Sequence, residues 1–199
     1  DGAWVNFTET AQNFKVKLFG PFSITYPMQM YHSVHGPVLK DDNKAYALRF
    51  VGMNDVNHST AWLKMNKSKN FDEWLDSLRM EQLASLNLVY ADKEDNIFFV
   101  HNVKSPVRDS NYNWKQVVPG NKSDLIWKDF HPFESVPQIL NPSSGYIFST
   151  NQNPFFVTAK EDNLSLSNFN PTMGFQTRTT NRAYRAYELL DADKSISFS

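Results

Sequence analysis

Residues 86–92 constrain the fold of this chain more than any other stretch, because they read as one β-strand with a single amide among apolar side chains. Successive side chains of a strand point to opposite faces, so Leu88 and Tyr90 share one face while Asn87 points to the other. Asn is depleted in strands, and a buried primary amide without a partner costs about 1–3 kcal/mol. Two interpretations of Asn87 stand at this point. Its side chain pairs with a neighbouring backbone group, or its amide is held ready to donate to a ligand oxygen.

A helix is predicted before this strand and a hairpin after it. Asn70 and Glu73 form a capping box, and the apolar residues of 71–78 recur at helical spacing. Residues 92–96 form a polar turn, after which residues 97–100 return as the antiparallel partner of the strand. The helix is therefore expected to bury one face against a sheet that contains the strand.

Short alternating strands dominate the first fifty residues, and much of the second half of the chain is loop. Gly20 and Pro21 separate the early strands as a turn, and prolines recur through residues 102–142. No strand–helix–strand alternation occurs, so the predicted fold class is α+β with antiparallel sheets. The other predicted elements are strands at residues 3–5, 14–18, 28–34, 46–50 and 145–149, a helical turn at 62–65 and an amphipathic helix from residue 181.

Composition excludes several classes of function. The formal net charge is −1 and the basic residues are scattered among acidic ones, which argues against nucleic acid or an anionic membrane surface as the main partner. The chain has no cysteine, so disulfides, thiolate metal sites and cysteine nucleophiles are excluded. No run approaches the roughly 18–20 apolar residues of a membrane span. The aromatic share of 15% fits large side chains that fill a core or line an apolar pocket.

Several segments, taken in order, form a series that extends over about residues 30–190. The segments are His35-Gly36-Pro37-Val38, Lys69-Asn70-Phe71-Asp72-Glu73-Trp74, Asn87 with Val89-Tyr90-Ala91-Asp92, Asn96-Ile97, Pro106-Val107-Arg108, Val118-Pro119-Gly120, Trp127, Asn141-Pro142 with Gly145-Tyr146-Ile147, Asn151, and Thr180-Asn181-Arg182-Ala183-Tyr184-Arg185 with Glu188-Leu189-Leu190. The whole series resembles the penicillin acylase family of N-terminal nucleophile hydrolases. Its last part is more similar to the acyl-homoserine lactone and aculeacin acylases than to the penicillin G enzymes.

This resemblance implies both a fold and a chemistry. The fold would be an αββα sandwich of antiparallel sheets with covering helices, incomplete in this chain. The chemistry would be hydrolysis of an N-acyl amide by a serine at the N-terminus of the mature β chain, whose α-amine is the base. Asn87 matches the family residue whose side chain donates to the oxyanion, and Arg108 matches an arginine that supports the active site. For Arg108 the alternative is a loop side chain that pairs with Asp109.

Other polar residues receive structural interpretations. His35 lies in a segment that is a turn between strands in the family, and Asp41 with Asp42 is interpreted as a solvated turn. Asp92 opens a hairpin turn, and the alternative is an approach to the family's calcium site. We assign no cofactor or metal to this chain, while the resemblance allows a structural calcium in the full enzyme.

The first residues determine which activity is expected of this chain alone. Asp1 is not a serine, threonine or cysteine, and residues 1–5 resemble a segment inside the family's β chain. We therefore expect a fragment, inactive alone, of a periplasmic or secreted enzyme whose nucleophile lies upstream. Its partners would be an N-acyl amide substrate, such as an acyl-homoserine lactone, a lipopeptide or a penicillin-like amide, and the remaining α and β segments of the same precursor. The alternative is a non-catalytic binding or assembly module with the acylase architecture.

One partial domain is predicted for residues 1–199. Its predicted parts are a core of sheet and helix at residues 1–101, a long loop at 102–142, and a strand, an irregular segment and a C-terminal helix at 143–199.

Overall fold

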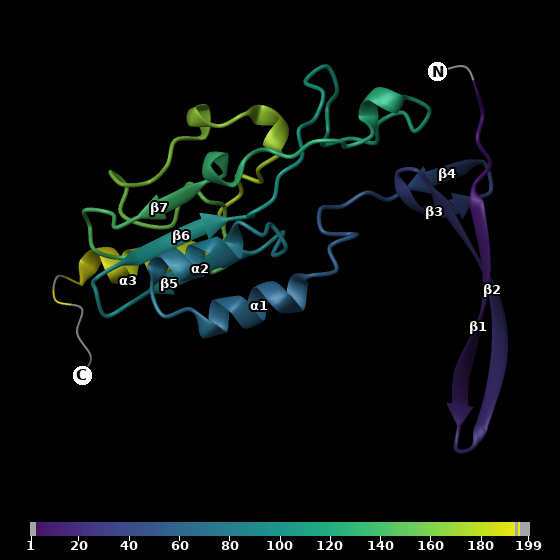
Figure 1. Ribbon diagram of the computed structural model, residues 1–199, viewed down its shortest axis with the longest axis horizontal. Coiled ribbons are helices and arrows are strands. Elements are labelled where there is room, and N and C mark those ends of the chain that lie inside the picture. The colour runs from purple at the N-terminus through teal and green to yellow at the C-terminus, as the bar shows by residue number, and fades with distance from the viewer. Residues whose placement is uncertain (1–2, 194, 196–199) are drawn as a thin grey trace. The chain divides into compact units, whose positions relative to one another are not determined.

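The computed structural model describes residues 3–193 and residue 195, and the chain divides into two compact units. The first unit holds the residues up to Phe50 together with Gln116–Ile126, and the second holds Val51–Lys115 and the residues from Trp127 onward. Strands β1 to β4 belong to the first unit, and helices α1 to α3 belong to the second (Figure 1). The single partial domain over residues 1–199 stays a prediction.

The first unit is built on a four-stranded antiparallel sheet in the order β1-β2-β3-β4. β1 and β2 form a long hairpin, in which Thr8 lies opposite His32. The hairpin turns at Gly20, whose φ of 53° lies in the left-handed region that glycine adopts without steric cost. The strands are Thr8–Phe19 (β1), Phe22–Ser33 (β2), Gly36–Asp41 (β3) and Lys44–Ala47 (β4), and a 3-10 turn covers Ser123–Leu125.

One face of this hairpin is apolar and exposed. Phe14 of β1 lies opposite Tyr26 of β2, and Val16 lies opposite Ile24. Their exposed fractions are 39% for Phe14, 57% for Tyr26, 44% for Val16 and 51% for Ile24. The residues between them in each strand, such as Lys15, are polar. The alternation is that of a strand pair with one face to be covered.

The second unit contains a three-stranded antiparallel sheet in the order β5-β6-β7 with β6 in the centre. Figure 1 shows the three strands with α1, α2 and α3 around them. The strands are Asn87–Ala91 (β5), Ile97–His101 (β6) and Gln138–Leu140 (β7), the helices are His58–Lys67 (α1), Phe71–Leu78 (α2) and Asn181–Ala192 (α3), and 3-10 turns cover Phe133–Ser135, Leu166–Asn168 and Pro171–Met173.

The capping residues predicted for α2 begin the helix as expected. Asn70 Oδ1 accepts a hydrogen bond from Glu73 N at 2.9 Å. In return, Glu73 Oε2 accepts from Lys69 N at 3.0 Å, one residue before the N-cap. Two backbone N–H groups that have no partner within the helix are thereby satisfied, which fixes the point where the chain enters α2.

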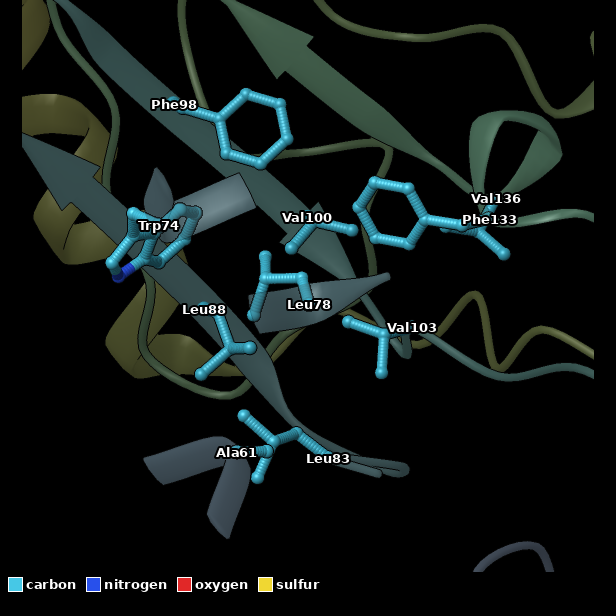
Figure 2. Close-up of a cluster of buried hydrophobic side chains, with 10 residues drawn as sticks. All are labelled: Ala61, Trp74, Leu78, Leu83, Leu88, Phe98, Val100, Val103, Phe133 and Val136. Atoms are coloured by element: carbon cyan, nitrogen blue, oxygen red, sulfur yellow. The ribbon is translucent and has the colours of Figure 1, made fainter. Parts of the chain in front are cut away.

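Side chains of α1, α2, β5, β6 and their connections form the larger of two buried apolar clusters among the described residues of the second unit (Figure 2). Leu78 of α2 lies at its centre, among side chains of the sheet, and has an exposed fraction of 0%. Trp74 of α2 packs on Tyr90 of β5 with ring centroids 4.8 Å apart. The cluster comprises Ala61, Trp74, Leu78, Leu83, Leu88, Phe98, Val100, Val103, Phe133 and Val136.

The central strand β6 is buried on both faces. Phe98 and Val100 point into the larger cluster, whereas Phe99 between them packs with Ile139 and Val157 in a second cluster. Phe99 and Val100 both have an exposed fraction of 0%. This double burial fixes the register of β6, because a slip by one residue would exchange the two faces.

Several predicted elements are confirmed by the structure. The predicted helix at residues 71–78, the hairpin of residues 86–100 and the C-terminal helix from residue 181 correspond to α2, β5 with β6, and α3. The predicted strands at 14–18 and 28–34 lie largely within β1 and β2, which are longer than predicted. The helical turn expected at residues 62–65 is part of the ten-residue helix α1.

Other predictions were wrong in extent or in type. Residues 3–5 form no strand, and Trp4 and Val5 are 92% and 86% exposed with no strand beside them in the described chain. Residues 145–149 also form no strand, because Tyr146 O is bound by the Thr158 hydroxyl at 2.7 Å instead of by a neighbouring strand. The three-residue strand β7 lies inside the predicted loop of 102–142. Its apolar residues are few and stand between Pro137 and Pro142, so the sequence pattern there is typical of a loop.

Within the described residues, none of the helices combines the length and the apolar character needed to cross a membrane. This finding agrees with the absence of a long apolar run from the sequence.

We expect Leu78→Ala to lower the free energy of unfolding of the second unit by about 2–5 kcal/mol, because it leaves a cavity among buried side chains. The matched control is Leu63→Ala, since Leu63 of α1 is 53% exposed and its truncation should cost under about 1 kcal/mol. Urea unfolding of the two variants measures both values. Equal destabilisation would contradict this description of the core.

Candidate functional site

The Asn87 side chain lies at the start of β5 and is half-buried. Its Nδ2 is 3.0 Å from the backbone carbonyl of Gln152 and 3.2 Å from the Ser149 hydroxyl. Its Oδ1 is 2.6 Å from His101 Nδ1. A carbonyl only accepts, so the Gln152 contact places the amide nitrogen on that side and the amide oxygen toward His101. Asn87 therefore has a backbone partner, as its structural interpretation requires. Its other amide N–H donates to the Ser149 hydroxyl, a partner that a ligand oxygen can replace.

The loop that carries Ser149 and Gln152 is held by the side chain of Gln152, which is only 3% exposed. Its Nε2 donates to Phe148 O at 3.1 Å and to Phe156 O at 2.8 Å. Its Oε1 accepts from the backbone N–H and the hydroxyl of Thr150. Every donor and acceptor position of this side-chain amide thus binds a group of the loop. These hydrogen bonds fix the backbone carbonyl of Gln152, which faces Asn87.

His101 is the last residue of β6 and lies directly opposite Asn87 in the β5–β6 register. Its ring packs beside Phe175 with centroids 6.0 Å apart. Burial lowers the pKa of His101 to about 4, because the charged imidazolium loses solvation. The ring is therefore neutral near pH 7. Because Asn87 Oδ1 is an acceptor, the proton of this neutral ring is on Nδ1.

Arg108 lies in a polar and aromatic environment. Its Nη1 donates to Thr172 O at 3.1 Å, and its guanidinium carbon is 4.9 Å from the ring centroid of Trp127 and 5.7 Å from that of Trp114. Its Nε is buried without a hydrogen-bond partner among the described residues. Burial lowers the pKa of Arg108, and the aromatic rings hold its charge in place.

The alternative interpretation of Arg108 concerned Asp109. The Asp109 carboxylate accepts a hydrogen bond from Asn111 N at 2.8 Å, which makes it part of a turn. The backbone carbonyl of Asp109 accepts from Trp114 Nε1 at 2.7 Å and so positions one of the two rings beside Arg108. Asp109 thus supports Arg108 through Trp114.

Residues 172–175 contact Arg108 and the ring of His101, which in turn binds Asn87. Thr172 accepts from Arg108, and Phe175 packs on the ring of His101, which binds Asn87. Between them, Gly174 has a φ of 76°, and a Cβ added there would lie 2.7 Å from Arg108 Nη1. Only glycine combines this backbone conformation with the close approach of the guanidinium.

The polar residues that were interpreted as structural lie in or beside turns. The Asp92 carboxylate accepts from Asn96 Nδ2 and Asn96 N at 3.0 Å each, and its pKa is lowered chiefly by the Asn96 side chain. His35 Nε2 is 3.0 Å from Gly120 O, and Asp42 N donates to Asp41 Oδ1 at 2.8 Å. In the part of the chain that the structure describes, no group of three metal-ligating side chains occurs. A calcium ion in a longer protein stays a prediction.

Three residues of the site were not assigned from the sequence. His101 directly follows the strand predicted at residues 97–100, and the observed register of the hairpin places it opposite Asn87. Gln152 and Ser149 belong to an irregular loop more than sixty residues away, and their contacts with Asn87 depend on tertiary packing.

The family model described as Penicillin amidase matches residues 1–199, the whole chain. The chain belongs to the penicillin amidase family. This membership confirms the resemblance inferred from the sequence. The roles of Asn87 and Arg108 as site residues stay predictions.

Similar proteins are known in sequence and in structure. Penicillin G acylase of Escherichia coli is 34% identical over 158 residues, which are 77% of this chain and 18% of that protein. Penicillin acylase 2 proenzyme of Pseudomonas sp. (strain SE83) is 28% identical over 121 residues, or 59% of this chain and 16% of that protein. A thermostable penicillin G acylase from Alcaligenes faecalis in orthorhombic form matches with a TM-score of 0.66 and 25% identity, over 83% of this chain and 30% of that chain.

The match to this penicillin G acylase structure confirms the predicted fold class, α+β of the N-terminal nucleophile hydrolase type with antiparallel sheets. The chain spans less than a fifth of the length of the two curated penicillin amidase relatives.

Substitution of Gly174 should disturb Arg108. We expect Gly174→Ala to displace the guanidinium, because the new methyl group would lie 2.7 Å from Nη1, and to cost roughly 1–2 kcal/mol in backbone strain. Gly145→Ala is the matched control, since Gly145 has the same φ of 76° and no atom within 4 Å of an added Cβ. Crystal structures and urea unfolding of both variants would test this. An unmoved guanidinium in Gly174→Ala would contradict the expectation.

Acid should weaken the fold at His101. The unfolded chain binds a proton at His101 near pH 6.5, whereas the folded chain binds it near pH 4, so the unfolded state holds more protons between these values. The contribution of the neutral ring to the free energy of unfolding is therefore fully present above about pH 6.5. It decreases as the pH drops, by up to about 3 kcal/mol. Urea unfolding across this range should show the loss in the wild type and a smaller loss in His101→Asn. Equal pH dependence of the two proteins would contradict the assignment of a buried neutral ring.

Proposed function

We propose that this chain is part of an amide hydrolase that cleaves N-acyl amides, and that Asn87 donates a hydrogen bond to the oxyanion of the tetrahedral intermediate. The nucleophile would be a serine at the N-terminus of the mature β chain, upstream of residue 1. Membership of the penicillin amidase family supports the class of reaction.

The arrangement of the Asn87 amide is the observation that carries this proposal. One N–H is directed at the fixed Gln152 carbonyl, and the other at the Ser149 hydroxyl, in the longer and more exposed of the two hydrogen bonds. A hydroxyl rotates and finds other partners easily, so this second N–H is the one available to a substrate oxygen. The hydrogen bond to Gln152 O and the contact with His101 keep the amide plane in place while the substrate oxygen replaces the Ser149 hydroxyl.

The reaction would proceed in two halves. The serine attacks the amide carbonyl, its α-amine takes the proton, and negative charge develops on the former carbonyl oxygen, where Asn87 donates. The α-ammonium group then gives its proton to the nitrogen of the leaving amine, and an acyl-enzyme remains. Water loses a proton to the α-amine as it attacks this ester, and a second oxyanion forms at the same donor. Its collapse releases the carboxylic acid and returns the proton to the serine oxygen.

Arg108 would support this site through residues 172–175. Its positive charge is fixed by Thr172 O and by the rings of Trp114 and Trp127, and residues 172–175 connect it to the environment of His101. A held cation near the site would favour the anionic intermediate and keep this segment in position.

The proposed substrates are acyl-homoserine lactones, lipopeptides or penicillin-like amides, and the proposed location is the periplasm or the outside of the cell. The proposed partners are the remaining segments of the same acylase precursor. The apolar face of the β1–β2 hairpin supports this partnership, because Phe14, Ile24 and Tyr26 are each more than a third exposed and would be covered by further strands or helices. This exposed face equally suits the second candidate function, a non-catalytic acylase-like module for binding or assembly.

Asn87→Ala in the full-length protein tests the proposal. We expect kcat for amide hydrolysis to fall by about 10²–10³-fold, because one oxyanion donor is removed. Steady-state kinetics with an N-acyl 4-nitroanilide that the wild-type protein hydrolyses would measure the loss, and thermal unfolding would report stability.

The control for this experiment is Asn96→Ala. Asn96 is also an amide of the β5–β6 hairpin, but its side chain binds Asp92 in the turn. We expect this variant to keep its kcat and to lose some stability. A kcat of Asn87→Ala equal to that of the wild type would contradict the oxyanion role of Asn87. A full-length protein without a processed N-terminal serine would favour the non-catalytic module.

A further inference from the structure

His101 is the one ring that binds the Asn87 amide among the described residues, and its backbone is held on two sides. His101 N donates to Pro137 O at 2.9 Å, and Asn102 N donates to Leu86 O at 2.8 Å. Asn102 Oδ1 also accepts from Ser85 N at 2.8 Å. These hydrogen bonds connect the end of β6 to the start of β5 and to the chain before β7. The backbone that carries the imidazole is therefore held in place.

The contacts of the Asn87 amide admit a single orientation. If the amide were rotated by half a turn, Oδ1 would face the Gln152 carbonyl, and acceptor would oppose acceptor. The observed orientation replaces this repulsion by a hydrogen bond of 3.0 Å to Gln152 O. It also directs Oδ1 at His101 Nδ1, 2.6 Å away, so this ring nitrogen is the donor.

The two contacts have different roles in this orientation. The Gln152 carbonyl binds one of the amide hydrogens and leaves the other directed at Ser149 Oγ. His101 binds the amide oxygen and leaves both amide hydrogens free to bind other groups. A donor on this oxygen also polarises the amide, which strengthens its remaining N–H as a donor.

We propose that His101 is a positioning residue, whose Nδ1–H holds the Asn87 carboxamide so that its outward N–H points to the substrate oxyanion. This inference rests on the proposed function of Asn87 and extends it to a second residue. His101 touches no reacting atom and acts only through Asn87.

Two substitutions of His101 separate positioning from packing. His101→Phe keeps a ring against Phe175 but has no donor, whereas His101→Asn places an amide N–H near the position of Nδ1. In the full-length protein, with the N-acyl 4-nitroanilide described above, we expect His101→Phe to lower kcat by about tenfold to a hundredfold with little change in KM. His101→Asn should recover most of this loss. A purely structural ring would give the opposite ranking, with His101→Phe the more active variant.

A double-substitution cycle with Asn87→Ala distinguishes failure of this inference from failure of the proposed function. If His101 acts through Asn87, His101→Phe should cause no further loss of kcat in the Asn87→Ala background. Independent, multiplicative losses would overturn the positioning role while leaving the oxyanion role intact. If Asn87→Ala alone keeps its kcat, the oxyanion role itself fails, and the inference fails with it.

The tautomer of His101 gives a test that needs no folded variant. Nitrogen-15 NMR of the histidine-labelled wild-type protein near neutral pH should show a protonated Nδ1 and an unprotonated Nε2 at His101. A proton on Nε2 would leave Asn87 Oδ1 without its donor and would overturn the inference, even if His101→Phe did not fold.

Discussion

Burial of β6 on both faces is the constraint on which the rest of the second unit depends. Phe98 and Val100 require a cover on one side and Phe99 requires one on the other, so this strand has to be the centre of its sheet. Helices α1 and α2 supply the first cover, and residues near Val157 supply the second. Because the register cannot slip without exposing these side chains, the position opposite Asn87 is assigned to His101.

The candidate site follows from this register with few additional elements. The end of β6 brings an imidazole to the Asn87 oxygen, and the loop beyond residue 148 brings a carbonyl and a hydroxyl to its nitrogen. The loop itself is organised around the buried Gln152 side chain, which binds backbone groups on both sides of it. A polar site thus lies at the edge of an apolar core, where the Asn87 and Gln152 amides have hydrogen-bond partners for both their nitrogen and their oxygen.

The sequence predicted the parts of the fold that depend on local signals. The capping residues before α2, the polar turn at residues 92–96 and the alternation in residues 86–100 each determine their structure within a few neighbours, and all three were confirmed. β7 was missed because three residues between prolines carry little periodicity, and residues 145–149 were assigned to a strand because alternation alone does not show that Thr158 binds Tyr146 O. Asn87 was singled out by its place in a strand, and the roles predicted for Asn87 and Arg108 rest on family resemblance. The contacts of Gln152 and Ser149 with Asn87 extend across more than sixty residues and left no local signal.

The amphipathic β1–β2 hairpin has a consequence for biogenesis. While the chain is being synthesised, such a hairpin exposes the apolar side chains of Phe14, Val16 and Tyr26, which can associate with other unfinished chains. Chaperones that bind extended apolar segments are suited to this interval. The order in which segments emerge and dock, in addition to the final stability of the sheet, would then govern how much correctly folded protein a cell obtains.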